Sequence, residues 1–318
     1  MALTCIGGDN SFLIMATLTV FTPAFNRAHT IGRTYDSLCR QTCKDFCWLV
    51  IDDGSSDNTR QLVEGWIAEC KIPIKYIYQQ NQGMHGAHNT AYRNIDTPLN
   101  VCIDSDDYMP DDGVEKIISC WSQNGSDQYA GIIGLDITTD GKILGTLFEP
   151  GMKSTTVSGF YQRGGQGDKK MVYRTEVIKR YPEYPIFEGE KYVGLAYKFM
   201  LIDQDYQLIT LNEPLVIVDY QQDGSSFNMY KQYWKNPQGF AFFRKTEMKF
   251  TKGLLRKWIV CTHYVSSSIM IHNRHFIQES PKKLLTFLSI PSGIGLYLWI
   301  RLMVSRNAKI SKRRIYSS

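Results

Sequence analysis

Two common nucleotide-binding signatures are absent from this 318-residue sequence: no GxGxxG follows the first predicted strand, and no GxxxxGK[ST] occurs anywhere. These absences disfavour a dinucleotide-binding fold and a P-loop, because both hold phosphate with glycine-rich loops. The first fourteen residues contain Asp9 and no lysine or arginine, so we do not expect them to be a secretory leader. We therefore interpret residues 1–14 as an N-terminal extension.

Acidic residues are scarce at the other end of the chain. Residues 241–318 contain fifteen Lys and Arg but only Glu247 and Glu279, a net charge of +13. The preceding 240 residues contain 21 basic and 29 acidic residues. This asymmetry predicts that the C-terminal part meets an anionic surface, either membrane lipid or nucleic acid.

The eight cysteines do not show the paired CxxC spacing of a zinc site. Cys39, Cys43 and Cys47 recur every four residues, but this stretch runs from a predicted helix into a predicted strand. We expect buried free thiols in a reducing cytoplasm.

Predicted strands alternate with predicted helices in the first part of the chain. The strand segments are β-branched or continuously apolar, and polar turns bound them. They span residues 17–22, 46–51, 74–78 and 99–103. The fold class predicted by this alternation is α/β, a mostly parallel, Rossmann-like sheet flanked by helices.

Right-handed crossovers place every strand-to-helix loop of such a sheet at one edge. The loops at residues 23–27, 52–57, 82–89 and 104–107 should therefore surround one crevice, where ligands of open α/β sheets bind. We expect a nucleotide-type site there.

The last of these loops carries three carboxylates, Asp104, Asp106 and Asp107. If the extended geometry continues past the strand, Asp104 and Asp106 point the same way. Two hard oxygen ligands suit Mg²⁺ or Mn²⁺ bound to a diphosphate. The alternative is a solvated acidic turn that caps a helix.

The second half of the sequence is less regular. We expect a strand at 129–137, a Gly- and Lys-rich loop at 164–170, a helix that opens at residues 188–190, two strands at 207–210 and 215–220, and a polar loop at 221–226. The predicted division is an extension (1–14), an α/β domain (15–227) and a helical, basic region (228–318).

Residues 284–300 form a run of seventeen uncharged residues flanked by Lys282, Lys283 and Arg301. A spanning helix needs about twenty apolar residues, and this run contains Pro291, Gly293 and Gly295. It favours an interfacial or re-entrant anchor over a span. A core helix with a solvated basic tail is the alternative.

Several motifs resemble those of the family 2 glycosyltransferases with the GT-A fold. They are FTPAFNR at 21–27, IDDGSSD at 51–57, NQG at 81–83, AHN at 87–89 and DSDD at 104–107. They occur in the family's order and spacing over residues 17–115. The likeness weakens over 160–230 and then lapses.

The resemblance implies an inverting sugar transfer from a nucleotide diphosphate to a hydroxyl. By this analogy Thr22, Pro23, Phe25, Asn26 and Asp53 hold the nucleobase. Asp104 contacts ribose or metal, and Asp106 ligates a metal ion that neutralises the leaving diphosphate.

The general base that the family implies is an acidic residue at the start of a helix. Glu190 occupies the matching place, but Lys191 stands where an Asp is usual. Glu188 and Asp168 are therefore alternatives. Met84 also departs from the family, which often has a Lys there, and the QxxRW motif of processive synthases is absent.

The function expected from the sequence is a metal-dependent transferase acting in cell-surface polysaccharide synthesis. We expect a nucleotide-sugar donor, with UDP favoured, and a glycan or lipid-linked acceptor. Residues 241–318 should bind the anionic inner face of the cell membrane, and no nucleic acid is expected. The alternatives are a non-catalytic membrane- or nucleic-acid-binding protein and a nucleotidyltransferase.

Overall fold

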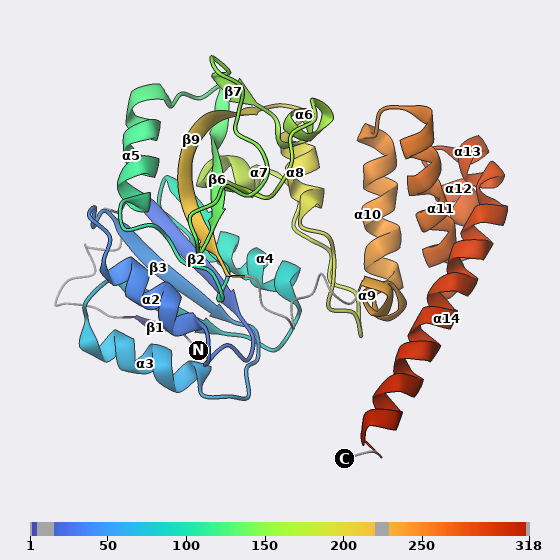
Figure 1. Ribbon diagram of the computed structural model, residues 1–318, viewed down its shortest axis with the longest axis horizontal. Coiled ribbons are helices and arrows are strands. Elements are labelled where there is room, and N and C mark those ends of the chain that lie inside the picture. Colours follow the sequence, from blue (N-terminus) through green and yellow to red (C-terminus); the bar gives the residue numbers. More distant parts are fainter. Residues whose placement is uncertain (1, 5–15, 220–228, 316–318) are drawn as a thin grey trace. The chain divides into compact units, whose positions relative to one another are not determined.

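The structure is a computed structural model that describes residues 2–4, 16–219 and 229–315 (Figure 1). The chain divides into two compact units. We call residues 1–183 and 198–221 the sheet unit, and residues 184–197 and 222–318 the helical unit.

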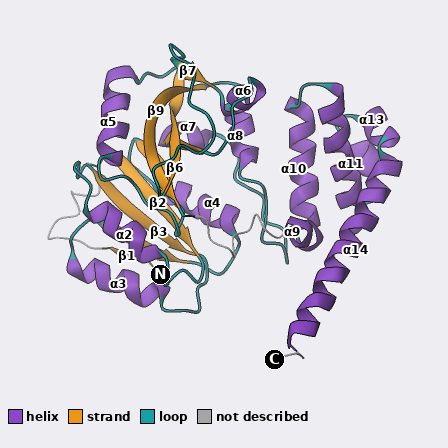
Figure 2. Cartoon of the chain, in the orientation of Figure 1, coloured by secondary structure: helices purple, strands orange, loops and turns teal. Residues whose placement is uncertain are grey.

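The sheet unit contains a nine-stranded sheet with the order β1-β4-β3-β2-β5-β8-β6-β9-β7 (Figure 2). Its strands are β1 (Ala2–Thr4), β2 (Leu18–Ala24), β3 (Phe46–Asp52), β4 (Ile74–Tyr78), β5 (Leu99–Cys102), β6 (Tyr129–Thr138), β7 (Ser154–Thr155), β8 (Lys169–Arg174) and β9 (Gln207–Val218). Its helices are α2 (Ile31–Cys39), α3 (Thr59–Glu69), α4 (Met84–Asn94), α5 (Gly113–Asn124), α6 (Val157–Gln162), α7 (Thr175–Arg180) and α8 (Ala196–Ile202), the last of which begins in the helical unit.

Parallel strands form the centre of the sheet, with β2 paired to both β3 and β5 and β3 paired to β4. The predicted α/β class is thus confirmed. Successive residues of β2 serve opposite faces, as the period of a strand requires. Val20 joins the core shared with α2, α3 and α5, whereas Phe21 packs edge-on against His88 and Tyr92 of α4.

Aromatic packing fixes two helices on one face of the sheet. Tyr35 of α2 stacks on Trp66 of α3 at 4.3 Å between ring centroids, and Trp48 of β3 lies 6.1 Å from Tyr35. The Trp48 indole also donates a hydrogen bond to the Thr22 hydroxyl at 3.0 Å. A fully buried tryptophan with its N–H satisfied contributes both apolar area and a fixed orientation.

β8 is antiparallel to both β5 and β6, so it enters the sheet at the edge where those two strands end. The carboxyl ends of β2, β3, β4, β5 and β6 and the amino end of β8 therefore share one edge, which we call the carboxyl edge. The loops that were predicted to surround one crevice therefore lie together at this edge.

The helical unit consists of helices joined by short turns: α9 (Met229–Lys235), α10 (Pro237–Phe250), α11 (Leu254–Met270), α12 (Phe276–Glu279), α13 (Lys283–Leu288) and α14 (Ile290–Ile315). Its core includes Met248, Val260, Cys261 and Tyr264. At Gly293 an added Cβ would lie 2.4 Å from Val265, so α14 crosses α11 closely there. Within the described ranges, no helix combines the length and the apolar character needed to cross a bilayer.

Some sequence predictions are wrong in the second half of the sheet unit. The two strands predicted between 207 and 220 are one strand, β9, whose register shifts beside Pro214. The helix predicted to open at 188–190 starts later, because residues 188–195 are not helical and α8 begins at Ala196. The loop predicted at 164–170 ends earlier, since Lys169 and Lys170 already belong to β8.

The ends and boundaries also differ from expectation. Residues Ala2–Thr4 pair with β4 as an edge strand, within the stretch expected to be a separate extension. The chain passes between the two units at residues 184, 198 and 222, whereas one boundary was predicted at 227. The polar loop predicted at 221–226 lies outside the described residues.

Cys70 is disulfide-bonded, so the expectation of free thiols is wrong for that residue.

Candidate active site

The loop after β2 and the loop after β3 are held together at the carboxyl edge. The Asn26 amide N–H donates to the Ser55 hydroxyl at 2.8 Å, and the Asn26 side-chain oxygen accepts from the Ser56 N–H at 2.8 Å. Asn26 adopts φ 54°, a left-handed conformation that asparagine tolerates better than most residues. Beside it Phe25 is 48% exposed, which is unusual for a large apolar side chain.

The residues before Phe25 are more deeply placed. Pro23 pairs with Ile51 inside the sheet and is buried. The Thr22 hydroxyl is fully buried and accepts the Trp48 hydrogen bond described above. The Thr22 side chain therefore belongs to the core and does not reach the surface of the edge.

Asp53 organises the loop that leads into α4. One carboxylate oxygen accepts from the Gln79 side chain at 2.7 Å and the Gln82 N–H at 2.8 Å. The other accepts from the Gly83 N–H at 2.8 Å. Asp53 is 4% exposed, so a nucleobase bound here would meet a carboxylate whose position is already fixed by hydrogen bonds. Its predicted role towards a nucleobase stays a prediction.

The acidic stretch after β5 forms a turn. The strand ends at Cys102, and the Asp107 N–H donates to the Asp104 carbonyl at 3.0 Å. The extended geometry assumed for Asp104 to Asp106 is therefore wrong, because a turn lies between them. Asp104 and Asp106 are half-buried, and Asp107 is buried.

These carboxylates lie close enough to affect one another's protonation. Burial, and then the charge of Asp104, raise the pKa of Asp106. The same two causes raise the pKa of Asp107 to about 7. Like charges that disfavour each other's ionised form are a common property of sites that receive a cation.

The donor set suits a divalent ion that arrives with its substrate. Asp104 and Asp106 offer carboxylate oxygens at one turn, and Mg²⁺ typically takes one or two carboxylates with phosphate oxygens and water. No cluster of three or more His, Cys, Asp or Glu side chains able to hold a metal ion occurs within the part of the chain that the structure describes. The two carboxylates alone thus make an incomplete site that a diphosphate would complete.

Asp136 and Lys170 are two further charged residues at this edge, and sequence reasoning missed both. Asp136 is on β6 and is 3% exposed, and its Oδ1 atom has no hydrogen-bond partner. Burial raises its pKa to about 6, although Lys170 acts in the opposite direction. The signal in the sequence was an aspartate inside an apolar predicted strand, where a charge is seldom placed without a role.

The three candidates for a general base have different surroundings. Both Glu190 oxygens accept backbone hydrogen bonds at 2.8 Å, from the N–H groups of Gln238 and Gly239 in the first turn of α10. Glu188 is exposed in the helical unit. Asp168 is exposed directly before β8, at the carboxyl edge.

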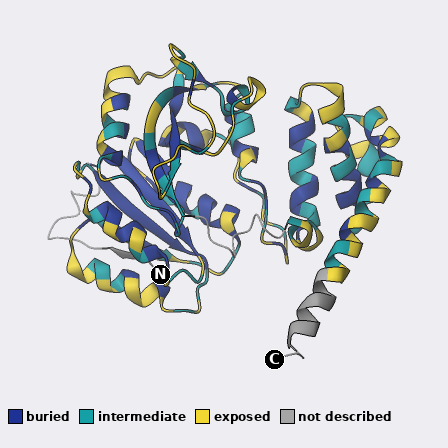
Figure 3. Ribbon diagram, viewed as in Figure 1, coloured by how far each residue is buried: buried dark blue, intermediate teal, exposed yellow. Residues whose placement is uncertain are grey.

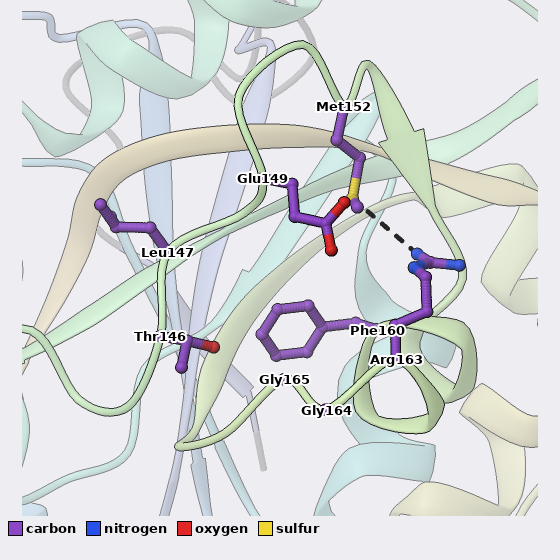
Figure 4. Close-up of a pocket in the computed structure, with 8 residues that line it drawn as sticks. All are labelled: Thr146, Leu147, Glu149, Met152, Phe160, Arg163, Gly164 and Gly165. Atoms are coloured by element: carbon purple, nitrogen blue, oxygen red, sulfur yellow. Dashed lines mark hydrogen bonds between the residues drawn. The ribbon is translucent and has the colours of Figure 1, made fainter.

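A separate pocket of about 180 Å³ lies within residues 146–165 (Figure 4). Its lining residues are Thr146, Leu147, Glu149, Met152, Phe160, Arg163, Gly164 and Gly165. The Arg163 guanidinium contacts the Met152 sulfur at 3.8 Å. None of the site residues predicted from the sequence lines this pocket.

The fold is that of an open α/β protein with polar loops at the carboxyl ends of its parallel strands, and comparisons with known proteins identify the family. The family model "Glycosyl transferase family 2" matches residues 19–181, which is half of the chain. The chain belongs to the family 2 glycosyltransferases.

Curated relatives and solved structures agree with this assignment. The chain is 25% identical over 215 residues to the Escherichia coli UDP-Glc:alpha-D-GlcNAc-diphosphoundecaprenol beta-1,3-glucosyltransferase WfgD, covering 67% of this chain and 80% of WfgD. It is 31% identical to glycosyltransferase GlyA of Streptococcus pneumoniae over 33% of this chain, but the match spans only 15% of GlyA. Residues 1–349 of S. aureus TarS, solved with UDP-GlcNAc, superpose with a TM-score of 0.59 at 15% identity, covering 92% of both chains. This likeness shows the GT-A fold.

Proposed function

We propose that this protein transfers a sugar from a UDP-sugar to a hydroxyl of a lipid-linked glycan, with a divalent metal ion at Asp104 and Asp106. The observation that carries the proposal is the pair of half-buried carboxylates at the carboxyl edge, next to the loops fixed by Asn26 and Asp53. The name of WfgD, which states a UDP-sugar donor and a diphosphoundecaprenol acceptor, supports the choice of substrates. The structure of TarS with UDP-GlcNAc supports a uridine nucleotide.

The proposed reaction is a single inverting displacement. The acceptor hydroxyl oxygen forms a bond to C1 of the sugar, and the bond from C1 to the diphosphate oxygen breaks with its electron pair. The hydroxyl proton passes to a carboxylate base. A bound Mg²⁺ or Mn²⁺ would supply neutralisation of the charge that the diphosphate gains, and solved structures of PcManGT from Pyrobaculum calidifontis and of GalNAc-T7 include Mn²⁺.

This chain's own residues would position the donor. The exposed Phe25 ring offers a stacking face for uracil beside Asn26 and the Asp53 loop. Glu190 remains the proposed base, with Glu188 and Asp168 as alternatives. Each Glu190 oxygen accepts one backbone hydrogen bond and keeps a second lone pair for a proton.

We also propose that the helical unit binds an anionic membrane surface. Leu254, Leu255 and Leu284 are 73–75% exposed, and Phe287 and Leu302 are more than half exposed. These side chains come from α11, α13 and α14, which contact one another (Figure 3). Lys282, Lys283 and Arg301 bound the uncharged run 284–300, which contains Leu284 and Phe287, and this is the composition of an interfacial helix surface.

Thermal unfolding with UDP, GDP and dTDP, each with and without Mn²⁺, tests the donor site. Nucleotide at about 100 times its dissociation constant should stabilise the folded state by about 2.7 kcal/mol, a shift of several degrees. We expect a Mn²⁺-dependent shift with UDP that is lost in Asp106→Ala.

Asp111→Ala is the matched control, because Asp111 is an exposed carboxylate in the segment that follows the turn. Its shift should equal that of the wild type. Absence of a shift with every nucleotide would contradict the proposal, and an equal loss in both variants would contradict the role of Asp106.

A further inference from the structure

Lys170 and its neighbour Lys169 differ in how their ammonium groups are used. The Lys169 Nζ donates to the carbonyls of Leu144 at 2.9 Å, Gln166 at 3.0 Å and Asp168 at 3.2 Å. The Lys169 ammonium is therefore fully occupied by backbone carbonyls near the start of β8. The Lys170 ammonium, in contrast, makes no hydrogen bond or ion pair with any residue that the structure describes.

The register of β8 places Lys170 next to the acidic turn. Val172 pairs with Val101 of β5, and Lys170 pairs with Gly134 of β6. Because β8 runs antiparallel to β5, Lys170 is level with the residues that follow Cys102. It stands between the acidic turn on one side and Asp136 on the other.

Three carboxylates act on this half-buried ammonium group. Burial opposes the charged form of Lys170, but Asp136, Asp104 and Asp107 outweigh burial, so its pKa lies above the usual value. Lys170 in turn lowers the pKa of Asp107 and Asp136 against the effect of their burial. The negative charges of these carboxylates thus keep the Lys170 ammonium protonated, although it forms no direct ion pair.

Asp136 is one of the buried carboxylates that act on Lys170. It is two residues beyond Gly134, the pairing partner of Lys170, and its Oδ1 lacks a hydrogen-bond donor. An unpaired buried carboxylate oxygen is destabilising, so it persists where a neighbouring charge or a ligand compensates it.

We infer that Lys170 binds the diphosphate of the nucleotide donor, and that Asp136 is the positioning residue that holds the Lys170 ammonium at the carboxyl edge. This inference rests on the proposed function. The edge carries Asp104, Asp106, Asp107 and Asp136, and a diphosphate that enters it needs cations to offset their repulsion. A metal ion bound at Asp104 and Asp106 would offset part of this charge. Lys170 offsets another part as an ammonium that forms no covalent bond and transfers no proton.

Titration calorimetry with UDP and with uridine, both in Mn²⁺, tests the inference. Uridine has no phosphate, so it reports the base and ribose contacts alone. We expect Lys170→Met to weaken UDP binding at least tenfold and to leave uridine binding within twofold of the wild type. Lys170→Arg should keep UDP binding within about threefold, and Asp136→Asn should weaken UDP binding less than Lys170→Met does.

Lys153→Met is the control for loss of one positive charge, because Lys153 is an exposed lysine of the same unit. It should leave both affinities unchanged. Equal UDP affinity in Lys170→Met and the wild type would overturn the inference, as would an equal loss for UDP and uridine. If Lys170→Met does not fold, Lys170→Gln gives the same comparison with a polar side chain. Failure of UDP to bind the wild type would instead overturn the proposed uridine donor.

Discussion

His88 is enclosed between α4 and the sheet, 3% exposed, with its Nδ1 atom 3.1 Å from the Tyr92 hydroxyl. Burial lowers its pKa from 6.5 to about 4. Between these two pH values the unfolded chain binds a proton that the folded protein does not bind. Stability is therefore fully present above pH 6.5 and is lost as pH falls towards 4.

From this shift we expect His88 to contribute about 2 kcal/mol of lost stability between pH 7 and pH 5. Urea unfolding at both pH values measures it. The pH-dependent loss should be smaller by about that amount in His88→Gln, whatever the variant's stability at pH 7. An unchanged pH dependence would contradict a neutral, buried His88.

The sequence predicted residues at the carboxyl edge where a motif marked them. Asp104, Asp106, Phe25 and Asn26 lie at the edge, as expected, because each follows the end of an apolar parallel strand. Asp136 and Lys170 were missed because their proximity depends on the antiparallel insertion of β8 between β5 and β6. No local pattern in the sequence specifies that pairing.

At the scale of secondary-structure elements, Glu190 joins the 184–197 segment to α10. Its two oxygens accept from the first free N–H groups of that helix, where the helix dipole also favours a negative charge. Glu190→Gln keeps the size of the side chain but removes the charge and one acceptor. We expect it to destabilise the helical unit by about 1–2 kcal/mol, measured by chemical unfolding.

Glu188→Gln is the matched control, since Glu188 is exposed two residues earlier and should leave stability within about 0.5 kcal/mol. Unchanged stability of Glu190→Gln would contradict the capping role. Sugar transfer by the two variants, measured well below their unfolding temperatures, then decides the base. Activity that Glu190→Gln retains and Glu188→Gln loses would move the proposed base to Glu188.

The elements of residues 17–124 could be predicted, since continuous apolar strands and amphipathic helices alternate there at short spacing. The later elements follow weaker patterns. β9 was predicted as two strands, but it is one strand whose register shifts on either side of Pro214, and the helix predicted from residue 188 begins only at Ala196. In both places tertiary contacts determine the backbone more than local propensity does.

At the scale of the whole molecule, the charge asymmetry of the sequence coincides with the division into units. Residues 241–318, with a net charge of +13, lie wholly within the helical unit. The exposed leucines of α11 and α13 lie in the same unit as these lysines and arginines. A lipid surface satisfies both features, because leucine enters the acyl boundary and each basic side chain adds about 1 kcal/mol near anionic headgroups.

We therefore expect the protein to cosediment with vesicles that contain phosphatidylglycerol and not with phosphatidylcholine vesicles. Leu284→Glu combined with Phe287→Glu should reduce the partition coefficient at least tenfold, because each change removes apolar burial and adds repulsion. Leu147→Glu is the control, since Leu147 is 51% exposed and belongs to the sheet unit. Equal partitioning of both variants and the wild type would contradict the membrane proposal. Salt-sensitive binding to duplex DNA, with no binding to vesicles, would favour nucleic acid as the partner of the basic helices.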